Sequence, residues 1–259
     1  MTQSHHSVVY GPLRTRRLGN SLGVNAVPST REACAPECVL CQSGLAEGVP
    51  ILSRVNQMPS AGVVVTTAAR KIIELSKAGE KVDSIVLGGD GDPVRHPALL
   101  EITENLRDLR NKWFPKADLC LLSDSDFPEE VDTHALSIFD KPILRFEWGT
   151  AKIYASMTSR PATALKHVIE RLAGVDRLIV QATFVQGTPD NSKEPEVRAW
   201  MKKLEELRPR EVHVLTIEGA RRGAKCKPVP ASKLEPIAAQ VTEKIGVPAT
   251  VFVQEAQPV

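Results

Sequence analysis

Apolar residues along the chain follow two alternating patterns. Short apolar runs predict strands, and longer segments with apolar positions three and four residues apart predict helices. The helix that begins near residue 66 is expected to end at Gly79, because glycine readily adopts the conformation that closes a helix. Strands are predicted at residues 22–27, 83–87, 117–122, 143–148, 178–185, 212–217 and 250–253, and further helices at residues 99–109, 164–172, 197–207 and 234–245.

This order of elements predicts an α/β fold. Apolar strands separated by helices form parallel sheets, because parallel neighbours need a crossover connection. The chain holds six core strands interspersed with helices and a trailing C-terminal strand, fewer than the eight strands of a closed barrel. A partial (β/α)6 TIM-like barrel and a doubly wound open sheet both fit this spacing. The 259 residues suit one domain, divided into an N-terminal extension (1–21), a core (22–220) and a C-terminal helix and strand (221–259).

The composition agrees with that of an ordinary soluble enzyme. Hydrophobic residues make up 42% and charged residues 25%, and no apolar run is long enough for a membrane span. The polar N-terminus lacks the apolar centre of a signal peptide, and clustered cysteines fit a reducing compartment, so we expect a cytoplasmic protein. A net charge of +2 gives little reason to bind a polyanion. Two basic clusters fit either a solvated surface or a site for an anion: Arg14, Arg16 and Arg17, and Arg221, Arg222, Lys225 and Lys227.

Three cysteines stand close together in the pattern CxxxCxxC, namely Cys34, Cys38 and Cys41. Neighbouring prolines disfavour a helix or strand, so we expect the thiols on a loop. A closed zinc site takes four ligands, whereas this loop supplies three. Three thiolates on a 4Fe-4S cluster leave one iron open to a substrate or a chelating cofactor. The spacing favours such a cluster, with zinc completed by a distant residue and buried thiols without a metal as alternatives.

The cysteine pattern and the motifs around it resemble a known family. CxxxCxxC is the signature of the radical S-adenosylmethionine (radical SAM) superfamily, and the similarity covers roughly residues 10 to 220. The motifs are similar in order and spacing to those of the wybutosine-synthesis-like branch of short, single-domain members. They are Tyr10-Gly11-Pro12, residues 16–25, Gly88-Gly89-Asp90-Gly91-Asp92-Pro93 with His96-Pro97, Ser159-Arg160-Pro161, Gly187, and Asp190-Asn191-Ser192.

The resemblance implies both the fold and the chemistry. It implies a single radical SAM domain built as a partial (β/α)6 barrel, in which Cys34, Cys38 and Cys41 hold a 4Fe-4S cluster. The open iron of such a cluster chelates the amino and carboxylate groups of S-adenosylmethionine (SAM). In the family, one electron from the reduced cluster releases methionine and a 5′-deoxyadenosyl radical, which abstracts hydrogen from the substrate. We therefore expect a metal-binding oxidoreductase with a reducing partner such as flavodoxin or ferredoxin.

Polar residues at the carboxyl ends of the strands are the candidate cofactor contacts, since both architectures place function there. In the family, the stretch that matches Gly88, Gly89 and Asp90 touches the amino group of SAM, and glycines let the backbone approach a ligand closely. An ordinary turn between strand and helix explains the same residues. The predicted cofactor contacts are Gly88, Gly89, Asp90, Gly91, Asp92, Ser123, Glu147, Gln181, Asn191 and Thr216.

Two departures from the family pattern and one additional thiol bear on the site. Ser123-Asp124-Ser125-Asp126 stands where relatives commonly have Thr-Asn-Gly. Leu40 stands just before the third cysteine, where most relatives have an aromatic residue. Cys226 follows the sixth core strand and is a candidate catalytic hydrogen-atom donor or auxiliary metal ligand, although a lone loop thiol is more often incidental.

Three functions agree with the sequence. The first is hydrogen abstraction from a small-molecule or peptide substrate, favoured by the compact chain. The second is modification of tRNA or a nucleobase, suggested by the named branch and the basic clusters but opposed by the near-neutral charge. The third is a non-catalytic iron–sulfur or zinc-binding module. No membrane partner is expected.

Overall fold

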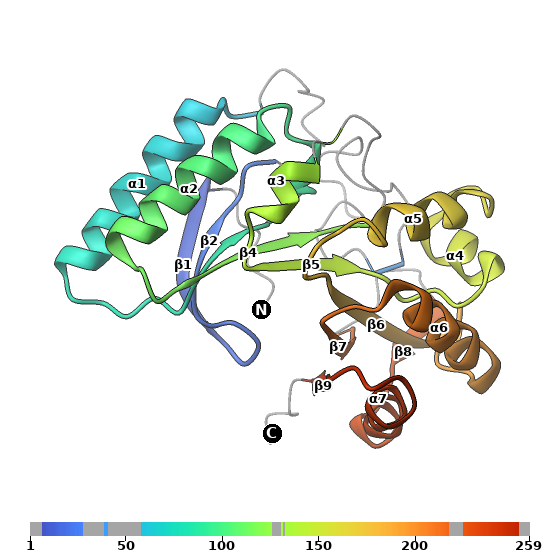
Figure 1. The fold of residues 1–259 in the computed structure, drawn as a ribbon. Coiled ribbons are helices and arrows are strands. Elements are labelled where there is room, and N and C mark those ends of the chain that lie inside the picture. The colour runs from blue at the N-terminus through green and yellow to red at the C-terminus, as the bar shows by residue number, and fades with distance from the viewer. Residues whose placement is uncertain are drawn as a thin grey trace. The chain divides into compact units, whose positions relative to one another are not determined.

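The computed structural model describes residues 7–27, 39–40, 58–125, 131, 133–217 and 225–253 (Figure 1). The predicted metal ligands Cys34, Cys38 and Cys41 lie outside these residues. The chain divides into two compact units. The first consists of Met1–Cys34, Ser43–Ile143 and Val175–Arg177, and the second of Ala35–Gln42, Leu144–Gly174 and Leu178–Val259.

The first unit is a sheet covered by helices. Strand β1 (Val9–Thr15) pairs antiparallel with β2 (Gly19–Val24), which pairs parallel with β3 (Ser84–Leu87). Strand β4 (Asp118–Ser123) extends the sheet parallel to β3. Figure 1 shows α1 (Ala61–Lys77) and α2 (Leu99–Trp113) lying side by side, and the two helices are in contact. The short elements η2 (Pro93–Arg95) and α3 (Thr133–Ser137) complete the unit.

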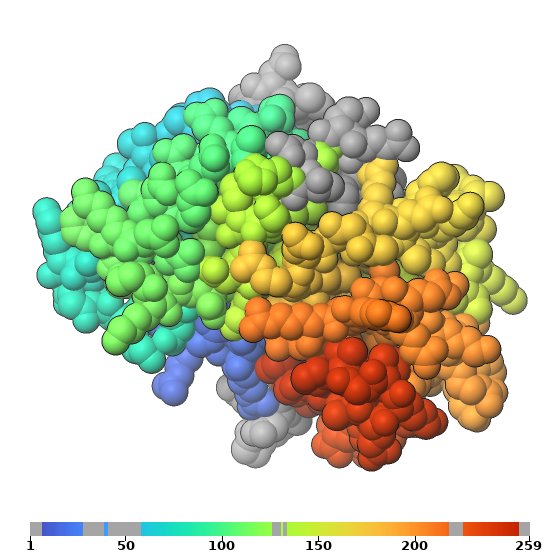
Figure 2. Space-filling view, in the orientation of Figure 1, coloured from blue at the N-terminus to red at the C-terminus, as the bar shows by residue number. Residues whose placement is uncertain are grey.

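The second unit repeats the same plan. Strand β6 (Ile179–Thr188) pairs parallel with β7 (Glu211–Thr216), which pairs parallel with β9 (Ala249–Phe252). Strand β8 (Lys225–Pro228) pairs antiparallel with the end of β6. Helix α7 (Ala231–Ile245) packs on β7 and β9 and is drawn in red in Figure 2. The other helices are α4 (Ala151–Thr158), α5 (Ala164–Leu172) and α6 (Glu194–Leu207).

Buried apolar residues explain why these segments form their elements. Every residue of β3 is buried, as expected for a parallel strand covered on both faces. In the second unit, the Trp200 ring of α6 packs edge-on against Phe184 of β6, with ring centroids 5.2 Å apart. The Trp200 indole also donates a 2.9 Å hydrogen bond to the Phe146 carbonyl, so this large side chain is buried without an unsatisfied donor.

The predicted α/β class is confirmed, and most predicted elements are present. Strand β5 (Lys141–Arg145) ends before residue 148, where the sequence predicted it to end. The predicted N-terminal extension contains β1, whose Gly11-Pro12 pair hid the strand pattern. Helices α3 and α4 and strand β8 were not predicted, because each is too short for a clear apolar repeat. None of the described helices is both long and apolar enough to cross a membrane.

Helix α1 begins five residues earlier than its apolar spacing indicates, because Ser60 caps it. The Ser60 hydroxyl accepts the Val63 N–H at 3.4 Å. We predict that Ser60→Ala lowers the free energy of unfolding by about 1 kcal/mol, whereas Ser60→Asp keeps the cap and costs little. Urea unfolding of the two variants checks this. Equal stability of both variants and the parent protein would show that the cap contributes nothing.

Candidate functional site

The first part of the candidate site is the loop that follows β3, residues 88–92, called here the glycine loop. Two backbone bonds attach it to the end of β2: Gly88 N–H donates to the Val24 carbonyl at 3.0 Å and Gly91 N–H to the Val27 carbonyl at 2.9 Å. A Cβ atom at Gly88 would lie 2.9 Å from that of Leu122. Close packing against neighbouring strands therefore requires a glycine there, whether or not a ligand also approaches.

The two acidic residues of the glycine loop have different surroundings. The Asp90 carboxylate accepts a 3.1 Å hydrogen bond from the Asn25 amide, and the Asp90 N–H donates back to Asn25 Oδ1 at 3.3 Å. Asp90 is therefore occupied by a protein partner. Asp92, two residues later, is 6% exposed and points into the protein. The sequence pattern alone did not separate these two roles.

Asp92 is a buried carboxyl group with one unused oxygen. The Ser123 hydroxyl donates to Asp92 Oδ1 at 2.6 Å, and the Val94 N–H donates to the same atom at 3.4 Å. Among the described residues, Asp92 Oδ2 has no hydrogen-bond partner. Burial, reinforced by the charge of Asp124, raises the pKa of Asp92 to about 7. Such a group binds a proton or a cationic donor readily, because either one satisfies the buried oxygen.

The structure thus brings together two residues that the sequence predicted separately. Ser123 ends β4, Asp92 follows β3, and these two strands are neighbours in the sheet. Ser123 is itself 6% exposed. The departure from the usual Thr-Asn-Gly pattern therefore still supplies a polar group at this strand end, and that group holds Asp92 in place.

In the second unit, the buried carboxylate is that of Glu147, just beyond β5. Glu147 is 1% exposed, and its Oε1 lies 2.5 Å from the Arg145 guanidinium. This ion pair supplies the buried carboxylate with a partner of opposite charge. Gln181 of β6 is connected to the residue before Glu147, because the Gln181 carbonyl accepts the Phe146 N–H at 2.9 Å. Gln181 pairs with His213 of the neighbouring strand β7.

Two other predicted cofactor contacts bind the protein backbone. The Asn191 amide donates to the Glu147 and Thr183 carbonyls, both at 3.0 Å, and its oxygen accepts the Val185 N–H at 2.7 Å. The Thr216 hydroxyl donates to a β6 carbonyl and accepts a backbone N–H from the residue after β8. Both side chains therefore hold the strand ends together. Their contact with a cofactor stays a prediction.

Cys226 lies in β8 opposite Gly187 of β6 and is 2% exposed. Burial raises the pKa of its thiol, so it carries its proton at neutral pH. A protonated thiol is the form that transfers a hydrogen atom, but the same burial suits a structural residue. The catalytic role of Cys226 stays a prediction.

Only Val39 and Leu40 of the cysteine segment are among the described residues. The Val39 N–H donates a 3.0 Å hydrogen bond to the Met157 carbonyl, near the end of α4. This bond fixes the backbone two residues before Cys41. Within the described part of the chain, no group of three or more His, Cys, Asp or Glu side chains is placed to hold a metal.

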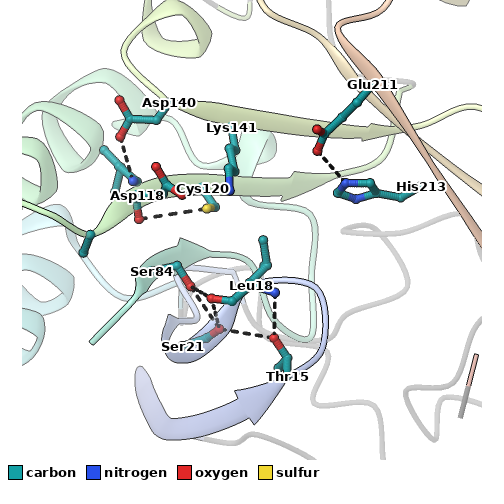
Figure 3. A network of polar contacts seen from close by, with 12 residues as sticks. Thr15, Leu18, Ser21, Ser84, Asp118, Cys120, Asp140, Lys141, Glu211 and His213 are labelled. Carbon is teal, nitrogen blue, oxygen red and sulfur yellow. Dashed lines mark hydrogen bonds and ion pairs between the residues drawn. The ribbon is translucent and has the colours of Figure 1, made fainter. Parts of the chain in front are cut away.

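The opposite, amino-terminal ends of the strands hold polar contacts of a structural kind (Figure 3). The Ser84 hydroxyl donates to the Leu18 carbonyl at 2.9 Å and lies 3.0 Å from the Ser21 hydroxyl. Cys120 of β4 is fully buried, and burial raises the pKa of its thiol to about 12. These groups satisfy one another and stabilise the sheet, so we place no ligand there.

The fold, with polar residues at its strand ends, is similar to the folds of solved structures of other proteins. The solved structures that it resembles include SuiB from Streptococcus suis bound to S-adenosylmethionine, with a TM-score of 0.56, 10% identity, and coverage of 74% of this chain and 43% of that chain. SuiB bound to its precursor peptide SuiA matches with a TM-score of 0.55 and 11% identity, over 74% and 42% of the two chains. This likeness confirms the predicted partial TIM-like barrel.

The relatives found by sequence comparison include several UPF0026 proteins. A UPF0026 protein from Helicobacter pylori is 23% identical over 216 residues, which cover 80% of this chain and 66% of the relative. A UPF0026 protein from Methanocaldococcus jannaschii is 32% identical over 102 residues, or 39% and 30% of the two chains. The chain thus spans about two thirds of the length of the Helicobacter relative. No family model matches the chain.

The raised pKa of Asp92 predicts a pH-dependent effect on stability. Folding favours the protonated form, so the carboxyl destabilises the fold increasingly as the pH rises from its ordinary value near 4 through its folded value of about 7. Asp92→Asn removes this charge and keeps an acceptor for Ser123. We expect its melting temperature to exceed that of the parent protein at pH 8 and to approach it at pH 5.

Thermal unfolding of the cluster-free protein at both pH values measures this difference. Asp108→Asn, at an exposed position, controls for the loss of one negative charge. A difference between Asp92→Asn and the parent protein that did not change with pH would contradict the buried, protonated state of Asp92.

Proposed function

We propose that the protein is a radical SAM enzyme that cleaves SAM reductively and abstracts hydrogen from a small-molecule or peptide substrate. The observation that carries this proposal is the CxxxCxxC motif, in a chain that shares its fold with SAM-bound SuiB. The motif supplies the ligands, and the fold places polar strand ends where a cofactor of this class is expected. At one such strand end, the Asp92 oxygen without a hydrogen-bond partner supports the binding of a ligand that carries a positively charged N–H donor group.

The proposed cluster ligands are Cys34, Cys38 and Cys41. Three thiolates suit an iron–sulfur cluster and leave one iron for the amino and carboxylate groups of SAM. When bound, the reduced cluster and SAM supply the 5′-deoxyadenosyl radical. The backbone bond between Val39 and Met157 gives this segment a fixed point close to Cys41.

We assign the amino group of SAM to Asp92 in place of Asp90. The family resemblance points to Asp90, but Asn25 already holds that carboxylate. Asp92 offers a buried oxygen that lacks a donor among the described residues, and an ammonium group supplies such donors. The positive charge of the ammonium group also stabilises the carboxylate form that burial disfavours. Ser123 keeps the Asp92 side chain in one orientation through its 2.6 Å bond.

In the second unit, Glu147 and Gln181 are the proposed contacts to the ribose hydroxyls of SAM. A carboxylate accepts hydrogen bonds from hydroxyl groups, and a glutamine amide both donates and accepts. The ion pair with Arg145 holds the Glu147 side chain in one orientation. Asn191 supports this arrangement by bonding to the Glu147 carbonyl.

A peptide substrate has specific support, because SuiB is solved with its precursor peptide SuiA. A small molecule fits the same proposal. Modification of tRNA or a nucleobase, and a non-catalytic iron–sulfur or zinc-binding module, are the alternatives that the experiments below separate. The reducing partner, such as flavodoxin or ferredoxin, and the cytoplasmic location stay predictions.

The first test is SAM cleavage after anaerobic loading with iron and sulfide and reduction with dithionite. We expect 5′-deoxyadenosine in the parent protein and none after replacement of Cys34, Cys38 and Cys41 by Ala, because the cluster is then lost. Cys120→Ala removes a buried thiol elsewhere and should keep both cluster and cleavage. A loaded cluster that yields no 5′-deoxyadenosine with peptide, small-molecule or tRNA candidates present would favour the non-catalytic module.

The second test concerns the Asp92 carboxylate. Only its charged form pairs with an ammonium group, so SAM affinity should rise as the pH increases through about 7. Asp92→Asn should weaken binding by about 10-fold to 100-fold at pH 8, the range for a hydrogen bond to a charged group. Equilibrium dialysis with labelled SAM, on oxidised cluster-loaded protein, measures both effects. Unchanged affinity in Asp92→Asn would remove Asp92 from the SAM site.

A further inference from the structure

The N-terminal motif residues that the sequence singled out contact the glycine loop directly. The Tyr10 hydroxyl donates a 3.0 Å hydrogen bond to the Gly88 carbonyl, across 78 positions of sequence. The Tyr10 ring lies against Gly23 so closely that any Cβ atom there would overlap it. Tyr10 therefore reaches the loop over a strand that has no side chain at that point. The need for space below this ring explains Gly23.

Asn25 makes the second contact. Its side chain is 7% exposed, and its amide exchanges two hydrogen bonds with Asp90: Nδ2 donates to the carboxylate and Oδ1 accepts the Asp90 N–H. The backbone of Asn25 is itself fixed, because its N–H donates to the Val8 carbonyl at 2.8 Å. Gly89 leaves room for this amide, since a Cβ atom there would lie 2.5 Å from Asn25 Oδ1.

Together these contacts leave the glycine loop little freedom. Its backbone is bonded to β2 and the residues after it at Gly88 and Gly91, its Gly88 carbonyl to Tyr10, and its Asp90 to Asn25. Asp92 is the last residue of the glycine loop, directly after Gly91. Its position therefore depends on these bonds to the residues that precede it in the loop.

We propose that Asn25 and Tyr10 are positioning residues for the amino group of SAM. They hold the glycine loop so that Asp90 is engaged by the protein and Asp92 presents its free oxygen to the ligand. The inference rests on the proposed function, because it concerns the same cofactor. It adds to that function separate roles for two carboxylates that lie two positions apart: Asp90 binds the protein and Asp92 binds the ligand.

Electrostatics support this division. Asp90 is a second carboxylate two positions before Asp92, and a side chain free to turn toward the ligand would compete for the same ammonium group. Two hydrogen bonds to Asn25 hold the Asp90 carboxylate in place. Desolvation, and then the charge of Asp90, raise the pKa of Tyr10 to about 12. The Tyr10 hydroxyl therefore remains a donor to Gly88 throughout the working pH range.

The test is an exchange of the two partners. Asn25→Asp alone places two carboxylates face to face and removes the donor to Asp90. The double variant Asn25→Asp/Asp90→Asn restores both hydrogen bonds, with the amide and the carboxylate in each other's positions. A general structural effect of either substitution would not be reversed by the second, whereas a specific pair is rescued by it.

The measurement is the dissociation constant of SAM for oxidised, cluster-loaded protein, by equilibrium dialysis. We expect Asn25→Asp to bind about tenfold more weakly and the double variant to recover to within about threefold, in line with coupling energies of contacting residues. Iron and sulfide content and the melting temperature are recorded for each variant. Tyr10→Phe, which keeps the ring over Gly23 and removes the hydroxyl, should weaken binding by about threefold.

The outcomes separate the inference from the proposed function. No SAM binding by a fully loaded parent protein would overturn the proposed function. Binding by the parent protein together with unchanged affinity in Asn25→Asp, or with no recovery in the double variant at normal cluster content, would overturn only the positioning role. If Asn25→Asp does not fold, Tyr10→Phe decides: parental affinity in that variant overturns the inference.

Discussion

The hydrogen-bonded pair of Asn25 and Asp90 is the contact on which the glycine loop of the first unit depends. It joins the end of β2 to the loop after β3, 65 positions apart in sequence. The backbone hydrogen bonds of Gly88 and Gly91 join the same loop to β2 and to the residues that follow β2. Because these bonds hold the loop, one buried carboxyl group can keep an oxygen without a partner at the cost of local stability. Unsatisfied buried groups of this kind are typical of sites that await a ligand.

The fold was largely predictable from sequence because its strands are short, apolar and separated by helices with clear spacing. The predicted elements were wrong or missing where the apolar pattern is interrupted, too short, or modified by a local capping residue. In β1, Gly11 and Pro12 interrupt the apolar pattern of the strand. The pairing of β1 with β2 is a tertiary contact, which the order of apolar and polar residues does not predict. In α4 and β8, the element is too short for an apolar repeat to form. Helix α1 began early because Ser60 caps it, a local signal weaker than the apolar spacing.

The sequence selected the residues of the candidate site by their place at strand ends but could not separate their roles. A polar residue at a strand end serves the backbone as readily as a ligand. Asn191 and Thr216 use their groups on neighbouring strands, whereas Asp92 retains a free oxygen. Asp90 and Asp92 occupy the same motif, and their partners distinguish them: Asn25 bonds to Asp90, and Ser123 bonds to the buried Asp92. The burial and the hydrogen-bond partners of each carboxylate depend on residues that lie far away in sequence and outside the motif.

The bond between Val39 and Met157 joins two backbone groups and uses no side chain. Its strength therefore depends little on which residues stand at positions 39 and 40, provided that position 39 is not proline. Substitutions at Val39 or Leu40 that change only the side chain should therefore leave this bond to α4 in place. Residue 40 is accordingly a suitable position for altering the surroundings of the last cysteine by design while its backbone support is kept.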